Sequence, residues 1–197
     1  MTNALTIDVE DYYHVSAFES IIKYEDWGRF ESRVEKNTLK IVELLNTFKI
    51  KATFFILGWI AERSPQMVKE IQKEGHEIAC HGYRHQLVYE IGPERFREDI
   101  TRSKRILEDI IGKEVIGYRA PSYSITKKSL WGLNILAEEG FKYDSSIFPI
   151  IHDRYGIMDF SRFPVRVNLN GSGGILEFPL STIRLFNSNF PVAGGGY

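Results

Sequence analysis

Cysteine is almost absent from this 197-residue chain, which has a single one at Cys80. One cysteine cannot form an internal disulfide, so no part of the predicted fold depends on an oxidising compartment. Long apolar runs are also missing, and none approaches the ~20 residues of a membrane span. The net charge of −1 and a pI near 6.5 give no electrostatic case for binding nucleic acid or an anionic membrane surface.

The N-terminus shows no targeting segment, because the first strand-like run begins almost directly after Met1. That spacing leaves no room for a signal peptide and predicts a soluble, cytoplasmic protein. A hydrophobic content of 43% can fill a proper core at this length. With no internal repeat, low-complexity tract or linker, we expect residues 1–197 to form a single domain.

Short apolar strands alternate with helical patterns along the chain. Strands are expected over residues 4–9, 51–57, 77–80, 115–119, 141–143 and 175–179. Helices are expected over residues 33–48, 64–75, 93–112 and 126–140. The second helix has clear start and stop signals, with Ser64 as its N-cap, Pro65 in the first position and Gly75 at its end. This alternation predicts right-handed βαβ units, a parallel sheet and an α/β fold.

The motif HGYRH, at positions 81 to 85, carries the strongest chemical signal. Its two histidines are four residues apart, which would place both on one side of a single helical turn. Two imidazoles and one carboxylate suit a zinc-type site that keeps one coordination position open for water. The general base found between the histidines of HExxH is missing here. We therefore expect the base elsewhere, with Asp8 of TIDVED, positions 6 to 11, as the candidate.

Polar side chains stand where the predicted strands end. Asp8, His81, Arg119 and Asp144 each close or follow a different strand. In (β/α) barrels the carboxyl ends of the strands form the active-site face. Four polar groups at equivalent strand ends therefore predict one shared site.

Each of these motifs also has a structural interpretation. An HxxxH pair is common, and an acidic cluster is more often a solvated loop or a helix N-terminus. Arg119 could be a structural arginine, and DSSIFP, at positions 144 to 149, an ordinary turn. The strand position of Cys80 favours a small buried apolar side chain over a ligand or nucleophile.

Taken in order, TIDVED, HGYRH, RAPSY and DSSIFP resemble the motifs of the polysaccharide deacetylase family, also called the NodB-homology domain or carbohydrate esterase family 4. The chain most resembles a branch with a DVED-type first motif that is linked to exopolysaccharide loci. The resemblance implies a distorted, incomplete (β/α) barrel. It also implies a divalent metal, zinc, held by His81 and His85, with Asp8 as the catalytic base. The remaining implied roles are Arg119 to hold and tune that base, and Pro121, Tyr123 and Asp144 to shape the acetyl-sugar groove.

Two departures from the family pattern matter. Many members have adjacent aspartates, but here Val9 follows Asp8, so the third ligand moves to Glu10 or Asp11. Strand parity favours Glu10, with Asp11 as the alternative if the chain turns early. The family's late Leu-x-His motif, which supplies an acid, is missing before the chain ends at GGGY, 194 to 197, and His152 lies in a different sequence context. We therefore expect a C-terminally truncated domain that lacks its last strand or strands.

The predicted function is metal-dependent hydrolysis of N-acetyl groups on a polysaccharide or oligosaccharide. Two alternatives remain open at this stage. One is hydrolysis of a small amide or ureide on the same scaffold, because a fold does not determine a substrate. The other is a non-catalytic carbohydrate-binding remnant, which the missing acid would favour.

Overall fold

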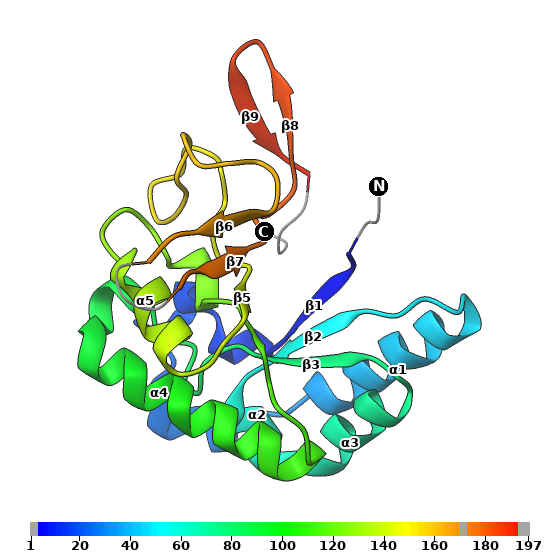
Figure 1. The fold of residues 1–197 in the computed structure, drawn as a ribbon. Coiled ribbons are helices and arrows are strands. Elements are labelled where there is room, and N and C mark those ends of the chain that lie inside the picture. The colour runs from blue at the N-terminus through cyan, green and yellow to red at the C-terminus, as the bar shows by residue number, and fades with distance from the viewer. Residues whose placement is uncertain (1–3, 170–172, 193–197) are drawn as a thin grey trace. The chain divides into compact units, whose positions relative to one another are not determined.

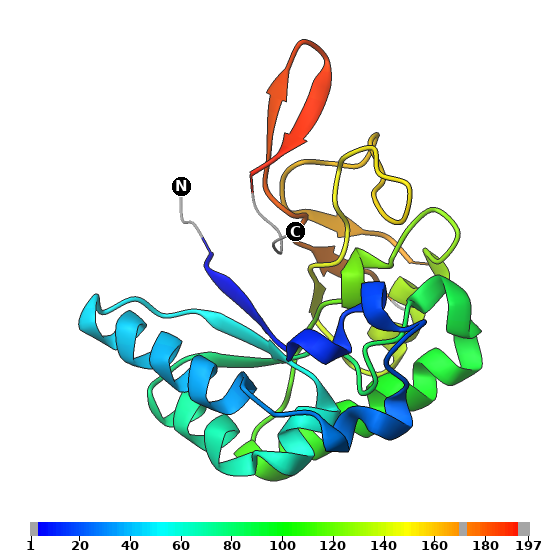
Figure 2. The ribbon, with the colours of Figure 1, turned by 180° about the vertical axis from the view of Figure 1, so that it is seen from behind.

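The computed structural model describes residues 4–169 and 173–192. The chain divides into two compact units, and each is described by itself. The first unit comprises Met1–Gln86 and Asp99–Val115, and the second comprises Leu87–Glu98 and Ile116–Tyr197. Figures 1 and 2 show the elements of both from opposite sides.

The first unit is built on three parallel strands in the order β1-β2-β3. These are β1 (Thr6–Val9), β2 (Thr53–Ile56) and β3 (Glu77–Cys80). The helices α1 (Val34–Thr47), α2 (Gly58–Arg63) and α3 (Pro65–Lys73) lie on one face of these strands (Figures 1 and 2). The register aligns the last residues of the strands, so the residues that follow them emerge at one edge.

Between β1 and α1 the first unit has three short 3₁₀ helices. They are η1 (Tyr12–His14), η2 (Ser16–Phe18) and η3 (Tyr24–Arg29). The long helix α4 (Val88–Ile111) contains one break, where Gly92 has a φ of 76° just before Pro93. Regular helix therefore begins at Pro93, as the sequence predicted, because proline fits the first turn of a helix and glycine tolerates the left-handed φ.

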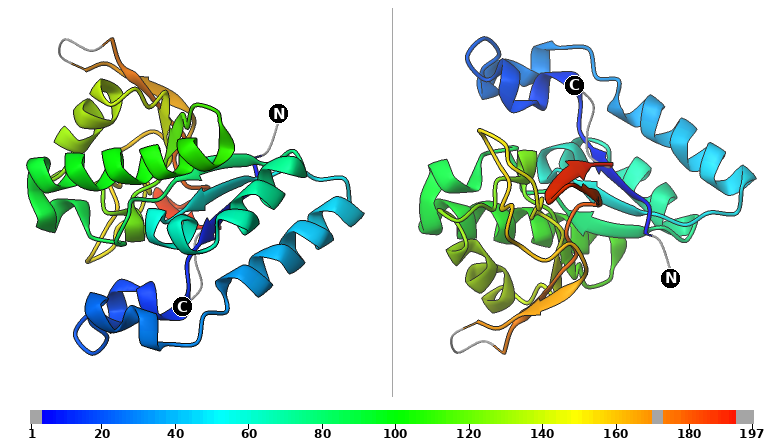
Figure 3. Two further views of the ribbon diagram at one scale, coloured as in Figure 1. Left: turned by 90° about the horizontal axis from the view of Figure 1, so that it is seen from below. Right: turned by 90° about the horizontal axis from the view of Figure 1, so that it is seen from above.

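The second unit has a four-stranded arrangement in the order β4-β5-β7-β6. Its strands are β4 (Gly117–Tyr118), β5 (Tyr143–Asp144), β6 (Val165–Val167) and β7 (Ile175–Glu177). Only β6 runs antiparallel to its neighbour β7 among these pairs. The unit also contains η4 (Pro121–Tyr123), helix α5 (Trp131–Glu138) and a hairpin of β8 (Thr182–Leu185) and β9 (Ser188–Pro191). Figure 3 gives two further views of these elements.

The expected α/β class with a parallel sheet is confirmed, although the described residues form no closed barrel. Of the expected strands, only 77–80 has its predicted bounds. The others are shorter or shifted, and in the second unit 115–119 becomes Gly117–Tyr118 and 141–143 becomes Tyr143–Asp144. The helix expected from 126 begins only at Trp131, after a turn. Ser64 does precede α3, but its hydroxyl donates to Glu35 instead of capping the helix. Helix α2, strand β6 and the β8–β9 hairpin were not predicted.

The GGGY ending at 194 to 197 lies outside the described residues. Among the residues that are described, no helix combines the length and apolar character needed to cross a membrane.

Candidate metal centre

Three side chains of the first unit converge beyond the carboxyl ends of β1 and β3. Glu10, His81 and His85 each offer a ligand atom, and these atoms all lie within 4.8 Å of one another. Glu10 Oε2 is 2.7 Å from His85 Nε2, and the centroids of the two imidazole rings are 5.5 Å apart. Glu10 directly follows β1 and His81 directly follows β3, so the parallel register brings them to one edge.

The HGYRH segment is not helical, which corrects the prediction of a single helical turn. Residues 81 to 87 form no regular secondary structure, and Gly82 and His85 have positive φ values of 75° and 54°. Two left-handed residues reverse the direction of the chain, and this reversal returns His85 toward His81. The four-residue spacing therefore brings the rings together by a tight loop, which the HxxxH pattern does not itself specify.

Asp99, at the start of the α4 segment in the first unit, holds this loop. Its Oδ2 accepts the Tyr83 N–H at 2.7 Å and its Oδ1 accepts the Arg84 N–H at 3.2 Å. Burial raises the pKa of Asp99 to about 6, against the lowering effect of those two hydrogen bonds. One carboxylate thus binds the backbone of both residues that precede His85.

The same loop is held on its other side by the beginning of α2. The Gly58 N–H and the Ser103 hydroxyl both donate to the Gly82 carbonyl, each at 2.9 Å. A Cβ on Gly58 would lie 2.7 Å from Ser103 Oγ and 2.8 Å from Tyr83 Cδ2, so only glycine fits there. Tyr83 is further held by a hydrogen bond from its hydroxyl to Glu62 at 2.7 Å.

The electrostatics of the cluster suit a cation. Burial alone would raise the pKa of Glu10, but the charge and hydrogen bond of His85, followed by the charges of His81 and His14, lower it to about 2. Glu10 is therefore ionised at neutral pH and lies against two imidazoles. Two histidines and one carboxylate form a donor set used by catalytic zinc sites, which leave a fourth position open. The residues present fit a divalent metal.

His14 is a third imidazole, next to this cluster, that sequence reasoning missed. Its ring is buried, with centroids 4.3 Å from Trp27 and 5.1 Å from Trp59. Its Nδ1 accepts the Asp11 N–H at 2.8 Å, which places the proton of the neutral ring on Nε2. Burial and the neighbouring His85 lower its pKa to about 3. The sequence around TIDVED did not predict that His14 is buried beside the cluster, because its burial depends on Trp27 and Trp59, which lie further along the chain.

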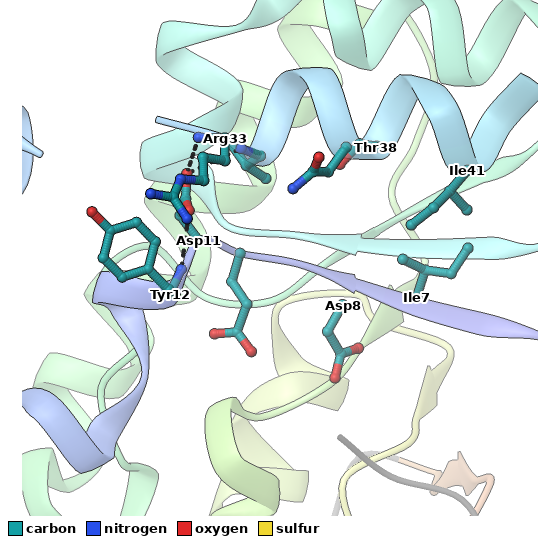
Figure 4. Close-up of a pocket in the computed structure, with 10 residues that line it drawn as sticks. Ile7, Asp8, Asp11, Tyr12, Arg33, Thr38 and Ile41 are labelled. Carbon is teal, nitrogen blue, oxygen red and sulfur yellow. Dashed lines mark hydrogen bonds between the residues drawn. The ribbon is translucent and has the colours of Figure 1, made fainter. Parts of the chain in front are cut away.

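Asp11, the alternative third ligand, takes part in backbone capping instead. Its Oδ1 accepts the Tyr12 N–H at 3.0 Å, and its Oδ2 accepts the N–H groups of Arg33 at 2.6 Å and Val34 at 3.0 Å. Figure 4 shows the Asp11 side chain pointing toward Arg33 at the start of α1. Between the two candidates, the geometry therefore favours Glu10 as the third ligand, as strand parity does.

Asp8 lies half-buried on β1 and lines a pocket together with Glu10. In Figure 4 its carboxylate points away from α1, whereas Ile7 points toward Thr38 and Ile41 of that helix. Alternation along the strand puts residues 8 and 10 on one side and residue 7 on the other. The predicted base and the predicted ligand therefore share a face of β1.

The remaining predicted residues lie in the second unit. Arg119 is buried, and its Nε and Nη2 donate to the carbonyl (2.9 Å) and hydroxyl (2.8 Å) oxygens of Ser145. Pro121 is buried at the start of η4, and Tyr123 has a φ of 52°, a left-handed value that costs energy for a non-glycine residue. Asp144 has an exposed fraction of 0%, so its side chain cannot contact a sugar directly in this structure.

Two further side chains named from the sequence have structural surroundings. Cys80 is buried, and burial raises the pKa of its thiol to about 12, which agrees with the small apolar role expected for it. His152 stacks on Tyr155 with ring centroids 3.8 Å apart, and its Nδ1 lies 2.9 Å from Asp153 Oδ1.

The amino-acid sequence matches one characterised family over more than half of its length. The profile described as polysaccharide deacetylase matches residues 24–143 of the chain. The chain belongs to the polysaccharide deacetylase family. The match includes the HGYRH loop, while Asp8 and Glu10 lie ahead of it. A second profile, described as a domain of unknown function (DUF3473), matches residues 145–197 of this family member.

Individual relatives agree with this assignment. Over 121 residues the chain is 33% identical to a peptidoglycan deacetylase-like protein of Gibberella zeae, covering 61% of this chain and 35% of that protein. Over 84 residues it is 36% identical to a peptidoglycan-N-acetylglucosamine deacetylase of Bacillus cereus, covering 43% of this chain and 39% of that protein. A crystal structure described as a polysaccharide deacetylase from Mycobacterium smegmatis superposes with a TM-score of 0.70 and 28% identity, covering 90% of this chain and 58% of that chain. The matched region thus spans well under half of either curated relative.

Proposed function

We propose that this deacetylase family member is a metal-dependent hydrolase that removes N-acetyl groups from a polysaccharide. The observation that carries the proposal is the convergence of Glu10, His81 and His85, with ligand atoms within 4.8 Å of one another. Zinc is the metal we propose, because two imidazoles and one carboxylate form a donor set that zinc prefers.

We propose separate roles for the metal ligands, the general base and the residue that supports the HGYRH loop. A divalent cation held by these residues would supply Lewis acidity, which would lower the pKa of a bound water molecule and polarise an amide carbonyl. Asp8, which lines one pocket together with Glu10, would accept a proton from the attacking water. Glu10, His81 and His85 would hold the cation, and the hydrogen bonds of Asp99 would keep the HGYRH loop in the shape that brings His85 into the cluster.

The roles predicted for the second unit are also proposals. We propose that Arg119 keeps the base oriented and ionised, and that Tyr123 contributes to the acetyl-sugar groove with Pro121. Because Asp144 is buried, we propose that it stabilises the turn that binds Arg119 and does not contact the sugar itself.

We propose two N-acetylated polymers as candidate substrates. The two curated relatives are named for action on peptidoglycan, so its N-acetylglucosamine units form the first substrate to test. The narrower proposal is an N-acetylated exopolysaccharide, which rests on the DVED-type first motif. Comparing acetate release from both polymers and from a small amide separates these choices.

Metal binding tests the central claim before any activity is measured. We expect isothermal titration of the metal-free protein to show one tight zinc site, which His81→Ala abolishes. The matched control is His152→Ala, a histidine outside the cluster, which should leave zinc affinity unchanged. Zinc should also raise the melting temperature, because a ligand that binds the folded state stabilises it.

Zinc-dependent acetate release from an N-acetylated polymer then tests the reaction. Retention of tight zinc binding in His81→Ala would show that the ligand assignment is wrong. Tight zinc binding without acetate release from any tested polymer or amide would support a carbohydrate-binding role in place of hydrolysis.

A further inference from the structure

Two carboxyl side chains of the second unit lie together in its interior, and only one of them was singled out from the sequence. Asp144 on β5 and Glu177 on β7 are direct partners in the parallel register. Both have an exposed fraction of 0%. The two carboxyl groups lie close enough to shift each other's pKa, and Glu177 Oε2 receives no hydrogen bond from the described residues. Two ionised carboxylates buried side by side would repel each other strongly. One of the pair must therefore carry a proton.

Burial and charge both place that proton on Glu177. Burial, followed by the charge of Asp144, raises the pKa of Glu177 well above its ordinary value. Burial also raises the pKa of Asp144, but Asp144 receives the Ser146 hydroxyl (2.5 Å) and N–H (3.3 Å), which favour its ionised form. The charge of Arg119 acts on both groups in the lowering direction.

The pair is connected to Arg119 through the turn that follows β5. Glu177 Oε1 accepts the Ile147 N–H at 3.0 Å, and Asp144 binds Ser146, so the two carboxyl groups anchor successive residues of this turn. The Ser145 carbonyl and hydroxyl oxygens then accept the hydrogen bonds of the Arg119 guanidinium. One residue further on, the Ser146 hydroxyl accepts the Ala120 N–H at 2.7 Å.

We propose that Glu177 is a positioning residue: as a neutral carboxylic acid it donates a hydrogen bond to the Asp144 carboxylate, and the pair fixes the turn that orients Arg119. The part of this proposal that concerns catalysis rests on the proposed function. The proton itself does not, because it is a property of the folded second unit. The DSSIFP turn thus holds the RAPSY segment directly. Glu177, about thirty positions further along the chain, in turn holds DSSIFP.

The protonation claim is tested by the pH dependence of stability. The folded state keeps the Glu177 proton above pH 4.5, the ordinary pKa of the group, while the unfolded state loses it. Folding then takes up one proton, so the folding equilibrium constant falls up to tenfold for each pH unit above 4.5. In Glu177→Gln this decrease should vanish, because an amide donates without titrating. The matched control is Glu94→Gln, an exposed glutamate on α4, which should follow the wild type.

The positioning claim is tested by kinetics on the zinc-loaded protein. Glu177→Ala should lower kcat at least tenfold with KM unchanged, since Arg119 loses its support while the groove remains. Glu177→Gln should restore most of kcat, because Oε1 still accepts from Ile147 and the amide still donates to Asp144. Asp144→Ala should behave like Glu177→Ala, since the Ser146 hydroxyl and N–H then lose their acceptor.

These experiments distinguish failure of the protonation claim, of the positioning claim and of the proposed function. Parallel stability curves for wild type and Glu177→Gln would overturn the inference, whatever the activity. Equal kcat in all three variants would overturn the positioning role alone, and a wild type without deacetylase activity would count against the proposed function alone. If Glu177→Gln does not fold, infrared spectroscopy of the ¹³C-glutamate-labelled wild type decides the point. A protonated buried carboxyl at neutral pH supports the inference, and its absence overturns it.

Discussion

Three acidic residues within four positions of the chain have three different surroundings. Asp8 lines a pocket with Glu10, Glu10 lies 2.7 Å from His85, and Asp11 accepts three backbone N–H groups. The strand period separates residues 8 and 10 from residue 9, and the chain turns at Asp11 to enter η1. At the scale of single residues, side-chain direction along the chain therefore separates the proposed base, the proposed ligand and the capping residue.

Asp8→Asn should abolish most turnover while leaving zinc binding intact. The amide cannot accept the proton of the attacking water, and the loss of a general base costs about 10²- to 10⁴-fold in rate. Acetate release and zinc titration on the same sample measure the two effects, with the exposed Asp109→Asn as control. Loss of zinc from Asp8→Asn would mean that base and ligand have been exchanged in the assignment.

Asp11→Ala should destabilise the protein without removing a metal ligand. The change leaves the N–H groups of Tyr12, Arg33 and Val34 without their acceptor, which we expect to cost about 2–4 kcal/mol. Urea unfolding measures the loss, and zinc titration of the folded fraction should match the wild type. Glu10→Gln is the counterpart, with weaker zinc binding expected. The opposite pattern in the two variants would make Asp11 the third ligand.

At the scale of elements, the loop of residues 81 to 85 depends on two helices for its shape. Its own sequence contributes Gly82, whose φ of 75° suits glycine, but His85 adopts a φ of 54° against its preference. Hydrogen bonds from the start of α2 and from α4 hold the intervening residues. The loop therefore brings the two histidines together only when both helices are in place.

Asp99→Ala should weaken zinc binding although Asp99 touches no metal. Without its carboxylate the Tyr83 and Arg84 N–H groups lose their acceptor, and His85 is no longer held. Removal of such supporting groups typically lowers metal affinity about 10- to 100-fold. Zinc titration measures the change, and Asp109→Ala on the same helix is the control. Unchanged affinity in Asp99→Ala would mean that the loop holds its shape without this carboxylate.

At the scale of the whole molecule, the interior carries ionisable groups that set the response of stability to pH. His14 is buried and neutral, with a pKa lowered to about 3 from 6.5, so the folded protein resists its protonation. The unfolded chain binds that proton below pH 6.5. Stability from this group is therefore complete above pH 6.5 and is lost as the pH falls toward 3.

The metal-free wild type should lose about 2 kcal/mol of stability through His14 between about pH 7 and 5. His14→Gln, which can still accept the Asp11 N–H without titrating, should lose less over the same interval by about that amount. Urea unfolding in the presence of a chelator, repeated at several pH values, measures the difference. Parallel curves for the two proteins would show that His14 titrates alike in the folded and unfolded states.

Much of the first unit was predictable, and the reason is periodicity. Apolar runs and helical spacing predicted β1, β2, β3 and α1 close to their observed bounds, and the proline and glycine at its ends predicted α3. Short elements of the second unit were predicted less well, since β4 and β5 have two residues each and give almost no periodic signal. The hairpin of β8 and β9 was missed because Phe186 and Asn187 form its turn without glycine.

The amino-acid order alone determined which residues end the strands and which side of β1 carries Asp8 and Glu10, because a strand has a fixed alternation of side chains. Only the tertiary structure decided the shape of HGYRH, the capping role of Asp11 and the pairing of Asp144 with Glu177. These features depend on contacts between residues from 15 to 33 positions apart, such as Arg84 with Asp99 and Asp144 with Glu177. Local patterns contain no information about such partners, so folding itself must bring them together.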